Sequence, residues 1–279
     1  MVGFEYHFPQ HLLSDLGNYG LLSTTIIVEK HFNNVDYSTV LRRLRILEKE
    51  GLIRRAGLLM TTENLWAIAP KGAKKMSLEN FKCFWNQASI DHDFKLIKLR
   101  MFLEELGIIK KWIAEHVIRS MIYKKYSLRD AKNKLIPDGI FETKIDNSSY
   151  SMAIELELNL KSQSRYKKIL GQYQWNKDLL GVWYIVPTLA ILNKLKDYWI
   201  RTMSSYTEGK IYFSLLDDLL TFKGESLLYS TNEKFLLKEF FKIPAHQTAQ
   251  EVVTIIEKPL QNEYRLTSSD HTLFKGHPN

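Results

Sequence analysis

Cysteine is almost absent from this chain: Cys83 is the only one among 279 residues. A lone cysteine excludes an internal disulfide and a cysteine-rich zinc site, and it fits the reducing cytoplasm, where we expect the protein to act. Long apolar runs are lacking too. The longest, around residues 182–192, is interrupted by Pro187 and Thr188 and is too short to cross a bilayer. The opening residues lack the basic end and apolar stretch of a signal peptide, so no membrane partner is expected.

Several familiar catalytic motifs are also missing. The sequence has no phosphate-cradling glycine loop, no HExxH helix, no nucleophile elbow and no internal repeat. Its composition is that of an ordinary globular protein, with 45% hydrophobic and 25% charged residues. The net charge of +8 and the pI near 9.3 suit a polyanionic partner. The length suffices for two modest domains.

Helix signals open the chain and a hairpin follows them. The third predicted helix is the clearest, with Asp36 or Ser38 as its cap and Gly51 as its stop. The expected elements are helices at 9–19, 23–32 and 36–50, with Val40, Leu44 and Leu47 as the buried stripe of the third, and strands at 52–55 and 65–68. This order resembles a winged helix, which we assign to residues 1–76, with a connector over 77–90.

The winged helix predicts which residues meet DNA. In this fold the third helix enters the major groove and the wing contacts the flanking backbone. Arginine supplies both phosphate affinity and bidentate recognition of guanine, which favours double-stranded DNA as the partner. The alternative is a solvated basic face on a domain that binds protein or dimerises. The candidate DNA contacts are Thr39, Arg42, Arg43, Arg54, Arg55 and Lys71.

Carboxylates occupy positions where a strand would carry apolar residues. Over residues 152–161 apolar and polar residues alternate strictly, so Glu155 and Glu157 share one face of a predicted strand. An earlier β-like run, 135–143, contains Asp138 within a Pro-Asp-Gly segment. The bland interpretation is a solvated sheet face with ordinary Glu/Lys alternation.

A turn-rich patch separates the two runs, so a hairpin is expected. A loop at 147–148 would put Asp138 opposite Glu157, whereas a loop at 146–147 would put it opposite Glu155. Either register gathers carboxylates on one face. Clustered carboxylates raise one another's pKa unless a cation neutralises them, so the cluster predicts a divalent-metal site suited to phosphodiester cleavage.

The order of these motifs resembles the PD-(D/E)XK nuclease superfamily and, more narrowly, the replication-relaxation family of mobile-element proteins. The residues that carry the resemblance are Asp91-His92-Asp93 at a helix start, Pro137-Asp138-Gly139, Glu155-Leu156-Glu157, and Arg165, Lys168 and Tyr173 on the next helix. The resemblance covers roughly residues 1–185. It implies an α/β (α+β) fold in which the winged helix precedes a mixed sheet flanked by helices, assigned to residues 91–230. A short helix and a loose tail are expected over 231–279.

The resemblance also implies roles for the acids. Asp138 and Glu155 would ligate Mg²⁺ or Mn²⁺, and Glu157 would be a third ligand or would position water. The family's lysine place, two residues after the second acid, holds Glu157, or Asn159 if Glu157 is that acid. Lys168, or alternatively Lys161, would then stabilise charge on the phosphate. His92 is expected to be a cap or a packing residue.

Two functions follow from these expectations. The first is a metal-dependent endonuclease that cuts DNA in plasmids or other mobile elements, with relaxosome proteins as further partners. The second is a non-catalytic DNA-binding accessory protein or repressor that keeps an inactive nuclease fold, which the missing lysine favours. The remaining elements are expected to be helices at 91–106, 164–177, 189–203 and 233–242 and strands at 111–119, 181–187 and 210–215.

Overall fold

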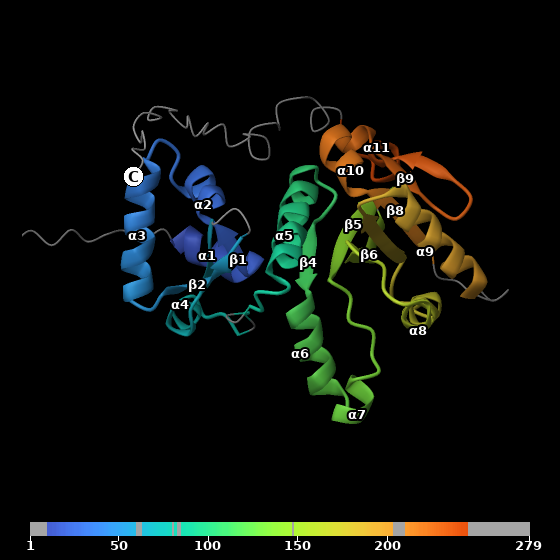
Figure 1. Ribbon diagram of the computed structural model, residues 1–279, viewed down its shortest axis with the longest axis horizontal. Coiled ribbons are helices and arrows are strands. Elements are labelled where there is room, and N and C mark those ends of the chain that lie inside the picture. Colours follow the sequence, from blue (N-terminus) through green and yellow to red (C-terminus); the bar gives the residue numbers. More distant parts are fainter. Residues whose placement is uncertain are drawn as a thin grey trace, which may run out of the picture. The chain divides into compact units, whose positions relative to one another are not determined.

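The computed structural model describes residues 10–59, 63–79, 81–82, 85–146, 148–202 and 210–244. Cys83 and the expected tail beyond residue 244 lie outside these ranges. A three-stranded sheet belongs to the N-terminal part, and a seven-stranded mixed sheet flanked by helices follows (Figure 1). The expected fold class is therefore confirmed. No helix in the described ranges is both long and apolar enough to span a membrane.

The N-terminal part has the three helices and the hairpin that the sequence predicts. Ser23 caps the second helix by accepting a hydrogen bond from the Ile26 amide, and Asp36 caps the third by accepting bonds from the Ser38 and Thr39 amides. Gly51 follows the third helix with a φ of 73°, which suits a residue without Cβ. The elements are α1 (Gln10–Tyr19), α2 (Thr24–His31), α3 (Tyr37–Lys49), β2 (Ile53–Leu58), β3 (Asn64–Ile68) and α4 (Pro70–Lys75).

A short strand before α2 completes the winged helix. This strand, β1 (Leu21–Ser23), pairs antiparallel with β3, and the sheet order is β1-β3-β2. Helix α5 (Ile90–Glu105) contributes Ile90, Phe94 and Ile97 to the same hydrophobic core. The helix therefore connects the winged-helix core to the part of the chain that carries the carboxylates.

The larger sheet has the order β10-β9-β8-β7-β6-β5-β4. Its three central strands, β6, β7 and β8, run parallel, because α8 and α9 return the chain between them, and the outer strands pair antiparallel. The bounds are β4 (Lys111–Ala114), β5 (Gly139–Ile145), β6 (Ser148–Leu156), α8 (Gln163–Gln174), β7 (Gly181–Val186), α9 (Leu189–Thr202), β8 (Ile211–Leu215), α10 (Leu216–Phe222), β9 (Leu227–Tyr229) and β10 (Lys234–Leu236).

Helices α8 and α9 cover one face of this sheet (Figure 1). Tyr166 and Leu170 of α8 pack there with Tyr184 of β7, and all three are buried. Strand β7 is buried along its whole length, as its continuous apolar sequence predicts. On β7, Trp183 packs against Phe241, with ring centroids 5.4 Å apart.

Two segments differ from the sequence-based expectation. The strand expected over 111–119 ends at Ala114 and continues as α6 (Glu115–Lys125), followed by the short α7 (Leu128–Ala131). Ala114 pairs with Gly139, and the partner chain before Gly139 contains Pro137, which has no N–H to donate. The helix expected over 233–242 is instead β10 and the short α11 (Leu237–Phe240), so the sheet continues past residue 230.

The acid-bearing strand is also shorter than its alternation suggests. Strand β6 ends at Leu156, and the Glu157 amide donates one last bond to the Ile185 carbonyl. Its neighbour β7 ends at Val186 before Pro187, so the chain beyond Glu157 has no strand to pair with. Lys161 therefore lies in the connection to α8 and not on the strand face.

Candidate active site

The hairpin register brings Asp138 and Glu155 together. In the β5–β6 pairing Ile145 lies opposite Ser148 and Gly139 opposite Ile154, which makes the loop 146–147 and leaves Asp138 beside Glu155. The second of the two registers considered for the sequence is thus correct. Oδ2 of Asp138 accepts a hydrogen bond of 2.8 Å from the Leu156 amide. This bond holds the carboxyl at the end of β6.

Glu155 is oriented by a tyrosine on α8. The Tyr173 hydroxyl donates a 2.6 Å hydrogen bond to Oε1 of Glu155. Burial, followed by the negative charge of Asp138, raises the pKa of Glu155 to about 8. Around neutral pH the carboxyl is therefore largely protonated unless a cation replaces the proton.

Asp138 experiences a similar environment. Burial raises its pKa, whereas the positive charge of His92 acts in the opposite direction. Within the described residues, Oδ1 of Asp138 and Oε2 of Glu155 accept no hydrogen bond. Two such oxygens fit a hard cation that takes one or two carboxylates and fills its other positions with water and phosphate. No cluster of three or more His, Cys, Asp or Glu side chains suited to a metal occurs in the described ranges, so a closed protein cage is not formed there.

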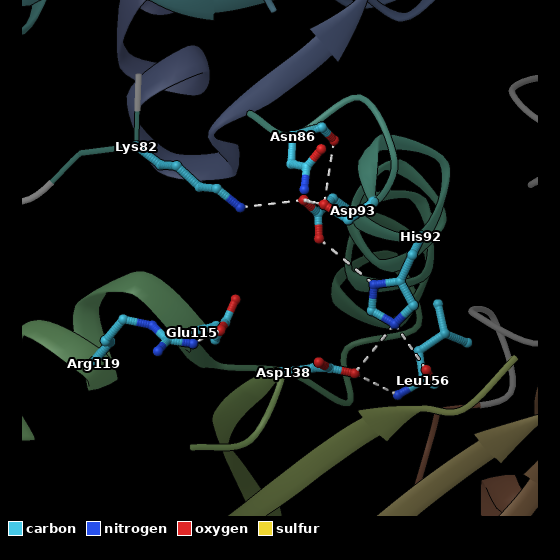
Figure 2. A network of polar contacts seen from close by, with 9 residues as sticks. Lys82, Asn86, His92, Asp93, Glu115, Arg119, Asp138 and Leu156 are labelled. Atoms are coloured by element: carbon cyan, nitrogen blue, oxygen red, sulfur yellow. Dashed lines mark hydrogen bonds and ion pairs between the residues drawn. The ribbon is translucent and has the colours of Figure 1, made fainter. Parts of the chain in front are cut away.

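A second set of polar residues reaches Asp138 from α5. Figure 2 shows the His92 ring directed at the end of β6, where Nε2 lies 2.9 Å from the Leu156 carbonyl oxygen and 3.6 Å from Oδ2 of Asp138. On its other side, Nδ1 lies 3.6 Å from Oδ1 of Asp93, which in turn pairs with Lys82 at 3.2 Å. Asp93 is the main reason that the pKa of His92 is raised to about 9. His92 is thus a charged neighbour of the site, in contrast to the cap or packing residue expected.

Glu157 and the two candidate lysines occupy different places. Glu157 is buried and forms an ion pair with Lys161, whose amide also donates a 3.1 Å bond to the Tyr166 hydroxyl. The charge of Lys161 lowers the pKa of both Asp138 and Glu155, although less than burial raises it. Lys168 is exposed on α8 and donates to Oδ1 of Asn133 at 3.3 Å. In the described contacts Lys161, rather than Lys168, accompanies the carboxylates.

Close packing explains why the Pro-Asp-Gly segment has a glycine at position 139. A Cβ on Gly139 would lie 2.2 Å from Cζ2 of Trp112, so any larger residue would displace that ring. Trp112 belongs to β4 and lies 5.4 Å from the guanidinium of the buried Arg100. Arg100 donates to the carbonyl and the side chain of Asn18, which ties α5 to the end of α1.

Sequence reasoning did not find the polar residues that begin α6. Glu115 is one of the charges that raise the pKa of Asp138, and burial lowers the pKa of His116. Both residues line a small cavity of about 40 Å³, and Asp93 and Asp138 line it too. The sequence analysis expected a strand over residues 111–119 and therefore missed these residues, because the helix that starts after Ala114 determines where they lie.

The candidate DNA contacts on α3 and the wing differ in their exposure to solvent and in whether they already contact another side chain. Arg42 is exposed, whereas Arg43 lies 5.5 Å from the Phe32 ring. Arg55 is exposed and pairs with Glu48 at 3.5 Å. The expected contact at Thr39 is half-buried, as is that at Arg54.

Lys71 has a structural partner. Its Nζ donates a 2.9 Å hydrogen bond to the Glu50 carbonyl at the end of α3, where a cation also complements the helix dipole. Arg45 is exposed one turn after Arg42 and was missed by the sequence interpretation. The i, i+3 spacing of the two arginines is the signal that could have identified it.

Comparison with known proteins identifies no family for this chain. No known protein family matches the chain, and no curated protein matches it. Among solved structures, the restriction endonuclease FokI bound to DNA matches with a TM-score of 0.23 and 11% identity, over 76% of this chain and 43% of that chain. The chain therefore spans less than half of that protein, and a match of this quality carries no argument about fold or function.

Proposed function

We propose that the protein is a DNA-binding, metal-dependent endonuclease in which Asp138 and Glu155 hold Mg²⁺ or Mn²⁺. The observation that carries the proposal is the pairing of these two carboxyls across the β5–β6 hairpin, where burial raises the pKa of both. A divalent cation would replace the shared protons and remove the repulsion. Such perturbed carboxyls are typical of functional sites, because burial without a partner destabilises the fold.

The surrounding residues have separate roles in this proposal. A bound ion would polarise a phosphodiester and lower the pKa of a bound water. Tyr173 donates its hydrogen bond to Oε1 of Glu155, so Oε2 is the oxygen that would bind the ion. Asp93 orients His92, whose Nε2 lies next to Asp138. Lys161 supplies the positive charge that would offset charge developing on the phosphate, with Lys168 as the alternative.

The winged helix would supply affinity for the DNA. Arg42 is an exposed arginine of α3 that would approach the duplex, together with Arg43 and the wing arginines Arg54 and Arg55. The resemblance of the sequence to replication-relaxation proteins is the reason to propose plasmids or other mobile elements, and relaxosome proteins, as the context.

A second function is favoured by one specific observation. The position two residues after Glu155 holds an acid, Glu157, and the nearby Lys161 is already paired with it. A site whose lysine is neutralised in this way would bind DNA without cutting it. The protein would then be a DNA-binding accessory or regulatory protein.

Metal binding and DNA cleavage test the two functions together. Asp138→Asn should abolish any rise in melting temperature caused by Mg²⁺ or Mn²⁺, because one of two carboxylate ligands is lost. The same change should abolish nicking of supercoiled plasmid, whereas duplex binding should persist. Asp197→Asn is a matched control, since Asp197 is exposed on α9 and, among the residues that the structure describes, pairs with Arg201.

The outcomes separate the alternatives. Nicking by the wild type that Asp138→Asn removes supports the endonuclease. Metal-induced stabilisation without nicking of any DNA substrate favours the accessory protein. If neither metal changes the melting temperature of the wild type, the carboxyl pair is not a metal site and the proposal fails.

A further inference from the structure

A groove lies beside the carboxyl pair, between α6 and α8. Its volume is about 910 Å³. Pro137, which directly precedes Asp138, forms part of its wall. The wall also contains Ile118 and Ile122 of α6 and Gln172 of α8. The groove therefore passes next to the proposed cleavage site without including the carboxylates.

Two hydrogen bonds keep this groove formed. Gln172 donates a 2.6 Å bond to the Asn133 carbonyl, and Lys168 donates a 3.3 Å bond to the Asn133 side chain. These bonds fix the segment after α7 against α8. The groove is thus held by contacts between two elements and does not depend on a ligand to assemble it.

The charge of the groove is positive and its rim is aromatic. Three lysines and a single acid, Asp178, line it. Lys134 lies 4.3 Å from the ring of Tyr126, which places an aromatic face beside a cation. Trp175 lines the groove at the end of α8 with 60% of its surface exposed, an unusual state for the largest apolar side chain. The three lysines are Lys134, Lys168 and Lys177.

We propose that this groove binds a single-stranded segment of DNA, with a base stacked on Trp175 and phosphates paired with Lys134 and Lys168. Aromatic side chains next to lysines are the usual means of binding single strands, since every base has a face for stacking. A duplex hides those faces inside its base stack, so stacking on Trp175 requires a single strand. This proposal rests on the proposed endonuclease function in one respect. If the protein cuts DNA, the strand bound in the groove would continue to Asp138, and the substrate would be DNA whose strands are separated.

Binding of an oligonucleotide tests the groove without any cleavage. The probe is fluorescein-labelled oligothymidine of about 15 nucleotides, added to the full chain in EDTA and measured by anisotropy. Trp175→Ala should weaken binding about 5- to 150-fold, the range expected for loss of one stacked base. Trp175→Phe should restore much of the affinity, because the ring still stacks. Lys134→Ala should lower the salt dependence by about 0.7 in the slope of log K against log salt.

A matched control separates stacking from the loss of any exposed ring. Phe222 is an aromatic residue of α10 with 57% exposure and does not line the groove. Phe222→Ala should leave oligothymidine binding unchanged. The melting temperatures of both variants should remain close to that of the wild type, because neither ring is part of a core.

The results distinguish this inference from the endonuclease proposal. Equal oligothymidine binding by wild type and Trp175→Ala, or an equal loss of affinity for a duplex of the same length in Trp175→Ala, overturns the groove assignment. Self-association that Trp175→Ala abolishes, without oligothymidine binding, would make the groove a protein interface and would also overturn it. Oligothymidine binding that depends on Trp175 in a protein that never nicks DNA would keep the groove and reject the endonuclease.

Discussion

Replacing Glu155 by glutamine should stabilise the metal-free protein at high pH. The folded pKa of about 8 lies above the value of about 4.3 for an unfolded glutamate. Between these values the folded state binds more protons than the unfolded state, so the stability of the wild type falls as pH rises. Glutamine carries no charge and keeps an oxygen that accepts the Tyr173 bond, so the variant should not lose this stability.

The size of the effect follows from the pKa. At about 1.36 kcal/mol per pH unit the difference gives an upper bound of about 5 kcal/mol above pH 8. The Glu155 carboxyl is only partly buried, and solvent screens its charge, so we expect about 2–3 kcal/mol. For a chain of this size that corresponds to roughly 4–12 °C in melting temperature.

The assay is thermal unfolding of wild type and Glu155→Gln in EDTA from about pH 4.5 to about pH 8.5. The difference between the two melting temperatures should be near zero at the acid end and grow with pH. His92, with a raised pKa of about 9, also makes the protein less stable as pH rises above about 6.5, but this loss is common to both proteins. Glu142→Gln is the control, because Glu142 lies on β5 in a surface pair with Lys111. A difference that does not change with pH would refute the argument that Glu155 is a partly buried carboxyl repelled by Asp138.

Three further changes probe other parts of the structure. Gly139→Ala should destabilise the protein by about 1–3 kcal/mol in urea unfolding, because its Cβ would lie 2.2 Å from Trp112; unchanged stability would mean that the ring moves freely. Trp183→Ala should lower stability by about 3–5 kcal/mol, whereas Lys111→Ala, in an exposed surface pair, should change it little, and equal small shifts would contradict the assignment of the core. Arg42→Ala should weaken duplex binding and reduce its salt dependence in anisotropy titrations, and an unchanged slope would remove α3 from the interface.

Local patterns in the sequence determined much of the fold. The winged helix follows from helix caps such as Ser23 and Asp36 and from the left-handed glycine Gly51, all of which act within one turn. The apolar run of β7 likewise indicated a buried central strand. The alternation over residues 152–161 placed Glu155 on the opposite face of the predicted strand from Ile154 and Leu156, because side chains alternate between faces with a period of two. The likeness to nuclease motifs directed attention to Asp138 from the sequence alone.

Only the tertiary structure decided what surrounds those acids. Whether Asp138 lay opposite Glu155 or Glu157 depended on a one-residue shift of a loop, which periodicity does not specify. His92 reaches the Leu156 carbonyl across 64 residues of sequence, and Lys161 meets Glu157 because β6 ends early for lack of a partner strand. Contacts between distant elements depend on packing and on which strands pair, and no local pattern records them.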